Sequence, residues 1–70
     1  MGRVSERLRI VAAQHEVDPM DLQYALKALK AKDENKKIEA LTYSDLVREK
    51  SNRVWDVAEN IHEAIENVGK

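Results

Sequence analysis

The sequence has no cysteine and no phenylalanine, and its 70 residues include one proline and two glycines. Without cysteine, neither disulfide bonds nor thiolate metal sites can stabilise the fold. The scarcity of proline and glycine, beside many Ala, Leu, Lys and Glu residues, is typical of helical proteins. No apolar run approaches the ~20 residues of a membrane-spanning helix, and the N-terminus lacks the apolar stretch of a signal peptide. We therefore expect a helical cytoplasmic protein that does not span a membrane.

Motifs that carry chemistry are also scarce. The two histidines, His15 and His62, are far apart, and neither belongs to a His-x3-His or cysteine-containing ligand set. His15 continues the apolar pattern of its segment, which favours a partly buried side chain, and His62 has Glu59, Glu63 and Glu66 nearby as ion-pair partners. The sequence has no Gly-rich phosphate loop and no Ser/His/Asp or Cys/His arrangement. We predict no enzymatic activity, no catalytic residues, no metal site and no cofactor.

What the chain does contain is one small domain over residues 1–70, with 43% hydrophobic residues and a net charge of −1. A chain of this length buries only about 60% of the surface that its unfolded form exposes. We therefore expect modest stability or a homo-oligomer, with a dimer as the simplest case. No global excess of positive charge draws the protein to nucleic acid. Small size and dense charge are also common among phage- and plasmid-encoded accessory proteins, which is an association only.

The stretch VDPMDL has the pattern of a helix start. Asp18 stands where an N-cap is expected, and Pro19 occupies the first helical position, where its missing N–H costs nothing. Asp21 falls at the third helical position, close to the free backbone N–H groups and the positive end of the helix dipole. The apolar residues at the two ends of the stretch, Val17 and Leu22, are placed to form a hydrophobic staple.

The stretch LTYSDL repeats this pattern, with Thr42 as the expected cap, Asp45 at the third helical position, and Leu41 with Leu46 as the hydrophobic staple. Ser5 is the expected cap of an earlier helix, and Gly69 sets the end of the last one. The charged stretch KDENKK reads as a solvated loop between the second and third helices. The sequence therefore predicts an all-α protein, a small three-helix bundle with helices over about 5–16, 19–32 and 43–68.

The third predicted helix carries an apolar seam with alternating spacings of four and three. Its members are Val47, Ser51, Val54, Ala58, Ile61, Ile65 and Val68. The seam keeps its phase through Ser51, which favours one long helix, bent at that point. A second row, two residues earlier at each step and therefore on the opposite face, is acidic. We call it the acidic row: Asp45, Glu49, Asn52, Asp56, Glu59, Glu63 and Glu66.

The acidic row has two interpretations. It is either a solvated face, or a docking strip for a protein with a basic surface. Trp55 lies beside the seam, where it either covers the edge of the core or anchors an interface, since buried tryptophans often dominate binding energy. The favoured hypothesis is a small non-enzymatic protein-binding module, such as an adaptor, inhibitor or assembly factor. Its binding residues would be Asp56, Glu59, Glu63, Glu66 and Trp55.

The stretch VAAQHEVDPMDLQYALK resembles the helix-turn-helix of phage-type repressors in the placement of its apolar residues, Ala12, Leu22, Ala25 and Leu26. The resemblance covers about twenty residues and implies a DNA-binding regulator whose recognition helix is 19–32. The implied DNA contacts are Gln23, Lys27, Lys30 and Lys32, with further phosphate contacts from Arg3, Arg7 and Arg9.

Four residues depart from the helix-turn-helix pattern. Glu16 stands where the turn usually has glycine, and His15 stands where a larger aliphatic residue is usual. Asp18 and Asp21 place negative charge at the end of the recognition helix that approaches bases and phosphates. DNA binding is therefore the alternative hypothesis.

The second predicted helix is apolar over a wide arc, so it must be covered from two directions. The small residues Ala28 and Ala31 permit close approach of another helix on one side. The first and third helices can supply this cover, or a second copy of the chain can supply part of it.

Overall fold

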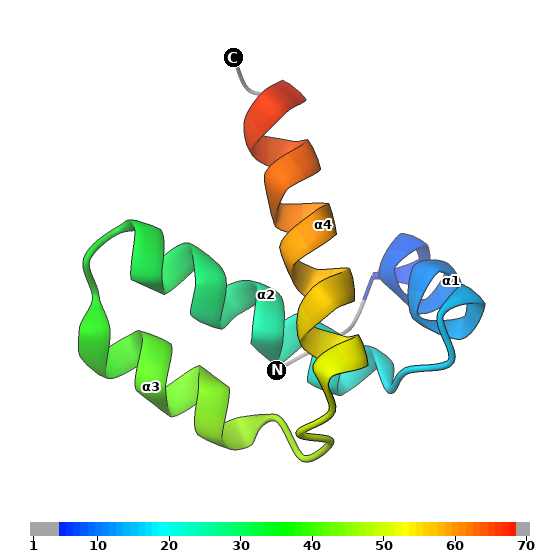
Figure 1. Ribbon diagram of the computed structural model, residues 1–70, viewed down its shortest axis with the longest axis horizontal. Helices are drawn as coiled ribbons and strands as arrows, with labels where there is room; N and C mark the ends of the chain where they lie inside the picture. Colours follow the sequence, from blue (N-terminus) through cyan, green and yellow to red (C-terminus); the bar gives the residue numbers. More distant parts are fainter. Residues whose placement is uncertain (1–4, 69–70) are drawn as a thin grey trace.

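The computed structural model describes residues 5–68, so two residues discussed above, Arg3 and Gly69, lie outside the described part. The described residues form helices and no strand, which confirms the predicted all-α class. The helices are α1 (Glu6–Gln14), α2 (Pro19–Asp33), α3 (Lys37–Leu46) and α4 (Asn52–Val68) (Figure 1). None of these four helices between Ser5 and Val68 combines the length and the apolar content that a membrane crossing needs.

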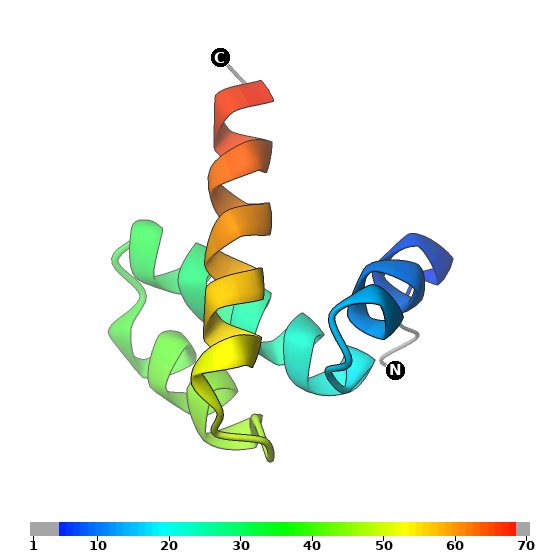
Figure 2. The same cartoon turned by 45° about the vertical axis from the view of Figure 1, so that its right-hand side comes forward.

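Helix α2 is the centre of the fold. It contacts each of the other helices, whereas the backbones of α1, α3 and α4 do not approach one another. Helices α2 and α3 form an antiparallel hairpin, α1 crosses the start of α2, and α4 rises across its middle (Figures 1 and 2). The wide apolar arc of α2 is thus covered from two directions within one chain, by α3 and by α4.

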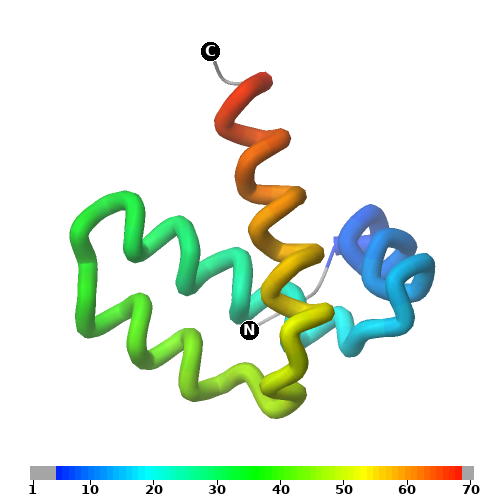
Figure 3. Tube along the Cα trace, viewed as in Figure 1, coloured from blue at the N-terminus to red at the C-terminus, as the bar shows by residue number. Residues whose placement is uncertain are grey.

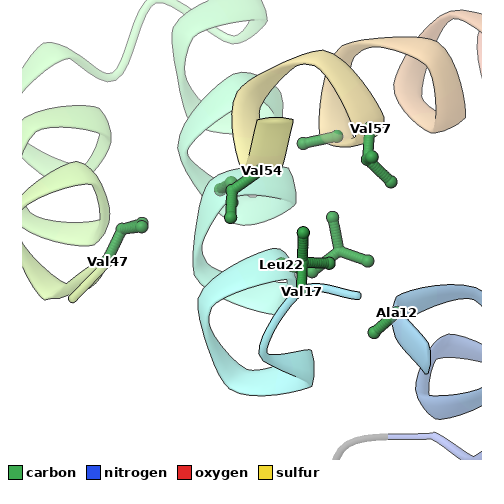
Figure 4. Packing of buried hydrophobic residues seen from close by; sticks show 8 residues of the cluster. Ala12, Val17, Leu22, Val47, Val54 and Val57 are labelled. Carbon is green, nitrogen blue, oxygen red and sulfur yellow. The ribbon is translucent and has the colours of Figure 1, made fainter. Parts of the chain in front are cut away.

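The core lies where the start of α2 meets α4 and the end of α1. Figure 4 shows Val54 and Val57 of α4 pointing toward Leu22 and Val17, with Ala12 of α1 on the other side. Val17 and Leu22 are both buried in this cluster, as a hydrophobic staple requires. The complete cluster contains Ala12, Val17, Leu22, Ala25, Val47, Val54, Val57 and Ala58.

Two predicted N-caps are confirmed. The Ser5 hydroxyl oxygen accepts a hydrogen bond from the backbone N–H of Leu8 (3.2 Å) at the start of α1. The Asp18 carboxylate accepts one from the N–H of Met20 (2.8 Å) at the start of α2. Both caps use partners two or three residues away, so the local sequence is enough to specify them.

The predicted long third helix is wrong: α3 ends at Leu46 and α4 begins at Asn52. The physical reason is Asp21, which is only 2% exposed. Its carboxylate accepts hydrogen bonds from the backbone N–H groups of Arg48 (3.0 Å) and Glu49 (2.9 Å). A continuous helix would pair those two N–H groups with carbonyls one turn earlier. A buried carboxylate without hydrogen-bond donors would cost more free energy than the end of the helix does. The chain therefore leaves the helical conformation, and the two N–H groups bond to Asp21.

The predicted cap at Thr42 is also wrong, because Thr42 lies inside α3 and its hydroxyl donates to the carbonyl of Ile38 (2.8 Å). Helix α3 begins at Lys37, within the stretch expected to be a loop, and its N-cap residue Lys36 makes no side-chain cap bond. The connection shrinks to residues 34–36 (Figure 3). Asn35 takes a left-handed conformation there (φ 61°), which closes the end of α2 in a Schellman motif.

The same motif ends α1. Glu16 has φ 56°, and the N–H of Val17 bonds to the carbonyl of Ala12 (3.0 Å). An αL conformation favours glycine and is tolerated by asparagine, so Glu16 is the more strained of the two left-handed residues. His15, expected to be partly buried, is exposed at this helix end.

Candidate protein-binding site

The acidic row lies partly on α4 and partly off it. Asp45 is on α3 and Glu49 is in the loop that follows, so neither continues the helical face of α4. The carboxylates that share α4 are all exposed: Asp56, Glu59, Glu63 and Glu66. Asp56 and Glu63 lie opposite the buried residues Val54 and Ala58, as the spacing predicts, whereas Glu59 lines a hollow beside Trp55 and Glu66 contacts His62.

Trp55 is half-buried and packs against the core cluster. Trp55 also lines a surface hollow of about 360 Å³. The hollow is lined by residues of α2, α3 and α4. We call it the α3–α4 groove, and its defining residues are Leu29, Lys32, Ala40, Leu41, Trp55 and Glu59.

A second hollow of about 440 Å³ adjoins the first, and it also includes Asn35 and Lys37. Lys32, Ala40 and Leu41 line both, so the two hollows form one continuous depression along α3. Two of the predicted site residues, Trp55 and Glu59, therefore lie in one concave surface. Sequence reasoning missed Leu41 because the predicted helix start at Thr42 assigned it to a staple.

Helix α3 supplies an unusual amount of exposed apolar surface. None of its residues is buried. Ile38 is 82% exposed and Leu41 is 66% exposed, although both are large aliphatic side chains. Helices of small domains normally bury an apolar face. In α3 the large aliphatic side chains are instead exposed to solvent, and no other part of the described chain packs over them.

The apolar seam of α4 has two different halves. Val54 and Ala58 are fully buried and Ile61 is half-buried, so the seam packs on the core as predicted over these turns. Beyond Ile61 the seam is uncovered, with Ile65 62% and Val68 86% exposed. The C-terminal turns of α4 extend past the rest of the fold, as Figures 1 and 2 show.

His62 faces a different set of partners from the one expected. Its Nε2 lies 2.5 Å from Oδ2 of Asp33 and 3.1 Å from Oε1 of Glu66. Glu66 was among the predicted partners, but Asp33 belongs to α2 and comes 29 residues earlier. The pKa of Asp33 is lowered from its usual value, first by a hydrogen bond with Glu66 and then by one with His62.

Of the residues proposed for DNA contact, one is partly buried and the others are exposed to solvent. Tyr24, beside them on α2, stacks on Tyr43 of α3 with ring centroids 6.4 Å apart. Gln23 is half-buried, whereas Lys27, Lys30 and Lys32 are exposed. The ammonium of Lys27 lies 5.5 Å from the ring centroid of Tyr43, in a cation–π contact. Helix α2 therefore uses much of its circumference for internal packing.

The chain matches no protein-family model, no curated protein and no solved structure.

Proposed function

We propose that this protein is a small non-enzymatic protein-binding module that holds a segment of a partner protein in the α3–α4 groove. The observation that carries the proposal is the meeting of Trp55, Leu41 and Glu59 in one hollow. A concave surface with an aromatic wall, an exposed leucine and a carboxylate at its edge suits an apolar anchor that is followed by a basic residue.

The apolar part of the groove supplies the affinity in this proposal. The hollow is lined mainly by carbon, and Leu41 contributes a large side chain that the fold itself does not cover. A partner helix that lies along α3 buries Leu41 and one side of Trp55 together. Tryptophan at the edge of such a pocket is a frequent hot spot of binding energy.

The charges supply the direction of approach. Glu59 is the member of the acidic row that reaches the groove, and the other carboxylates of α4 continue the same negative field. A partner with lysine or arginine beside its apolar anchor is steered to this edge, and one with acidic residues there is rejected. The partner that we propose therefore has a basic amphipathic surface.

We propose in addition that two copies of the chain associate through the uncovered end of α4. Ile61, Ala64, Ile65 and Val68 line a shallow apolar hollow of about 280 Å³ there. Ala28 and Ala31, the small residues first considered for this contact, are buried within the single chain. The end of α4 is therefore the better surface for a dimer.

The second candidate function is DNA binding through α2. It is favoured by the turn after α1, where Glu16 takes the left-handed conformation that glycine has in helix-turn-helix units. It is disfavoured by the packing of α2 against every other helix, because a recognition helix needs a free outer face to enter the major groove.

The test uses the fluorescence of Trp55, the single tryptophan of the chain, as a reporter of the groove. The probe is a helical peptide with leucines on one face and lysines on the other, and its control replaces each lysine with glutamate. We expect the lysine peptide to change the Trp55 emission, with an affinity that falls as salt rises, and the glutamate peptide to have no effect. Leu41→Asp should weaken binding at least tenfold.

Matched variants distinguish binding in the groove from non-specific binding to exposed apolar side chains. Ile10→Asp introduces the same charge at an exposed apolar residue of α1, away from the groove, and should leave peptide binding unchanged. Glu59→Lys should weaken binding, whereas Asp45→Lys, which is exposed on α3, should have a smaller effect. Equal losses from Leu41→Asp and Ile10→Asp would contradict the proposed site.

A parallel titration with duplex DNA addresses the second candidate. A DNA-binding regulator neutralises phosphates, so its affinity falls steeply with salt. Affinity that disappears on joint reversal of Lys27 and Lys30 to Glu would favour DNA binding over the groove.

A further inference from the structure

Three side chains from two helices place their metal-ligating atoms at one point. They are Asp33, the last residue of α2, and His62 and Glu66 on α4. One imidazole nitrogen and two carboxylate oxygens lie within 4.8 Å of one another. The cluster is separate from the residues that define the α3–α4 groove, and the proposed function uses only the charge of one member, Glu66.

The positions of these groups follow from the fold. His62 and Glu66 are four residues apart on α4, so they project from one face of the helix. The crossing of α4 over α2 brings that face to the end of α2. The His62 side chain is only 22% exposed, which holds its ring in place while Nε2 points at the two carboxylates. Asp33 stands at the C-terminal, negative end of the α2 dipole, where a cation is stabilised.

The three groups hold one another through shared protons, since Asp33 makes side-chain hydrogen bonds with both Glu66 and His62. Two carboxyl groups in contact repel each other unless a proton or a cation lies between them. A divalent cation satisfies all three groups at once, because each can give it one lone pair.

The chemistry of the ligands selects the class of metal. One imidazole nitrogen with two carboxylates suits Zn²⁺ and its neighbours, whereas Mg²⁺ and Ca²⁺ prefer oxygen ligands alone. Ligands about 2.1 Å from a tetrahedral ion lie about 3.4 Å from one another. The Nε2–oxygen distances of 2.5 and 3.1 Å are somewhat shorter, so small side-chain rotations open the space for an ion.

We propose that Asp33, His62 and Glu66 form a binding site for a divalent transition-metal ion of the Zn²⁺ class. The protein supplies three ligands, and a water molecule completes a tetrahedron on the exposed side. The ion joins the end of α2 to the C-terminal half of α4. It thereby fixes the part of α4 from which the uncovered apolar turns extend.

The test is a calorimetric titration of the untagged, metal-free full chain with Zn²⁺. We expect one ion per chain, together with a rise in the melting temperature in the presence of Zn²⁺. His62→Asn should abolish binding, whereas His15→Asn, which removes the other histidine at an exposed position, should leave it intact. Glu66→Gln should weaken binding at least tenfold, and Glu63→Gln, the same change three residues away on α4, should not.

A second measurement keeps the proposal testable if a variant does not fold. In the wild-type protein, Zn²⁺ should shift the side-chain nitrogen resonances of His62 and leave those of His15 in place. Equal loss of binding in His62→Asn and His15→Asn, or no binding of Zn²⁺ by the wild type, would overturn the site. Binding of Mg²⁺ with the same affinity as Zn²⁺ would overturn the assignment to a transition metal.

Discussion

The carboxylate of Asp21 accepts a hydrogen bond from the backbone N–H of Arg48, 27 residues further along the chain (3.0 Å). With the second bond, to the N–H of Glu49, it fastens the loop between α3 and α4 to the start of α2. A second contact supports the same junction, because the Arg48 guanidinium lies 3.5 Å from the Asp18 carboxylate. That ion pair is largely exposed and contributes little beside the buried Asp21.

Asp21→Ala should therefore destabilise the protein by about 2–3 kcal/mol, because it removes two hydrogen bonds to a charged acceptor and leaves two N–H groups without it. Asp45→Ala is the control, since Asp45 is exposed, and it should change stability by no more than about 0.5 kcal/mol. Urea denaturation measures both. Equal stability of the two variants would mean that the Asp21 contact does not hold the loop.

Alanine substitutions at the two residues expected to cap helices, Asp18 and Thr42, should have different effects on stability. Asp18→Ala should cost about 0.5–2 kcal/mol, the usual loss for an N-cap. Thr42→Ala should cost little or should stabilise, because Thr42 lies within α3 and alanine is the better helix former. The same denaturant series measures both variants. A cap-sized loss in Thr42→Ala would favour a helix start at that residue after all.

The left-handed residue that ends α1 offers a stabilising change. Glu16→Gly should raise the free energy of unfolding by about 0.5–1 kcal/mol. Glycine removes the strain of the αL conformation, and this gain exceeds the loss that comes from the greater conformational entropy of glycine in the unfolded chain. The exposed ion pair of Glu16 with Arg53 (3.6 Å) is too weak to offset this gain. Asn35→Gly is the matched change at φ 61°, and it should gain less because asparagine tolerates that conformation. Thermal melts of the two variants decide the order.

The proposed dimer predicts a concentration-dependent sedimentation coefficient. Ile65→Glu places a charge on the uncovered end of α4 and should give a monomer of unchanged stability, because Ile65 is exposed within the single chain. Ile10→Glu, on α1, should remain a dimer. A wild-type protein that sediments as a monomer at all accessible concentrations would remove this contact.

The starts of α1 and α2 could be predicted from the sequence because their causes are local. The Ser5 and Asp18 caps and the Val17–Leu22 pair involve partners within five residues. The break before α4 could not be predicted, because it arises from a buried carboxylate on another helix. Asp21 fits the pattern of a helix start so well that its position suggested a local role.

The candidate site could be predicted only in part, because helical spacing is local whereas contacts between helices are not. The exposed face of Asp56, Glu59, Glu63 and Glu66 follows from helical spacing, which survives the wrong helix boundary. The groove depends on how α3 and α4 sit on α2, and no spacing within one helix contains that information. Asp33 beside His62 is a similar case, since the crossing of two helices brings them together.

The central position of α2 has a consequence for motion. Helices α1 and α3 pack mainly on α2, and their backbones approach neither each other nor α4, so each can open locally while α2 and α4 stay packed together. Helix α1 buries only Ala12, and α3 buries no residue. Local unfolding of these two helices therefore exposes the least buried apolar surface and costs the least free energy. Their amide hydrogens should exchange with solvent through local opening, while those in the middle of α2 exchange only when the whole chain unfolds. A partner that lies along α3 would slow the exchange of that helix first, and the protein would become more uniformly rigid once bound.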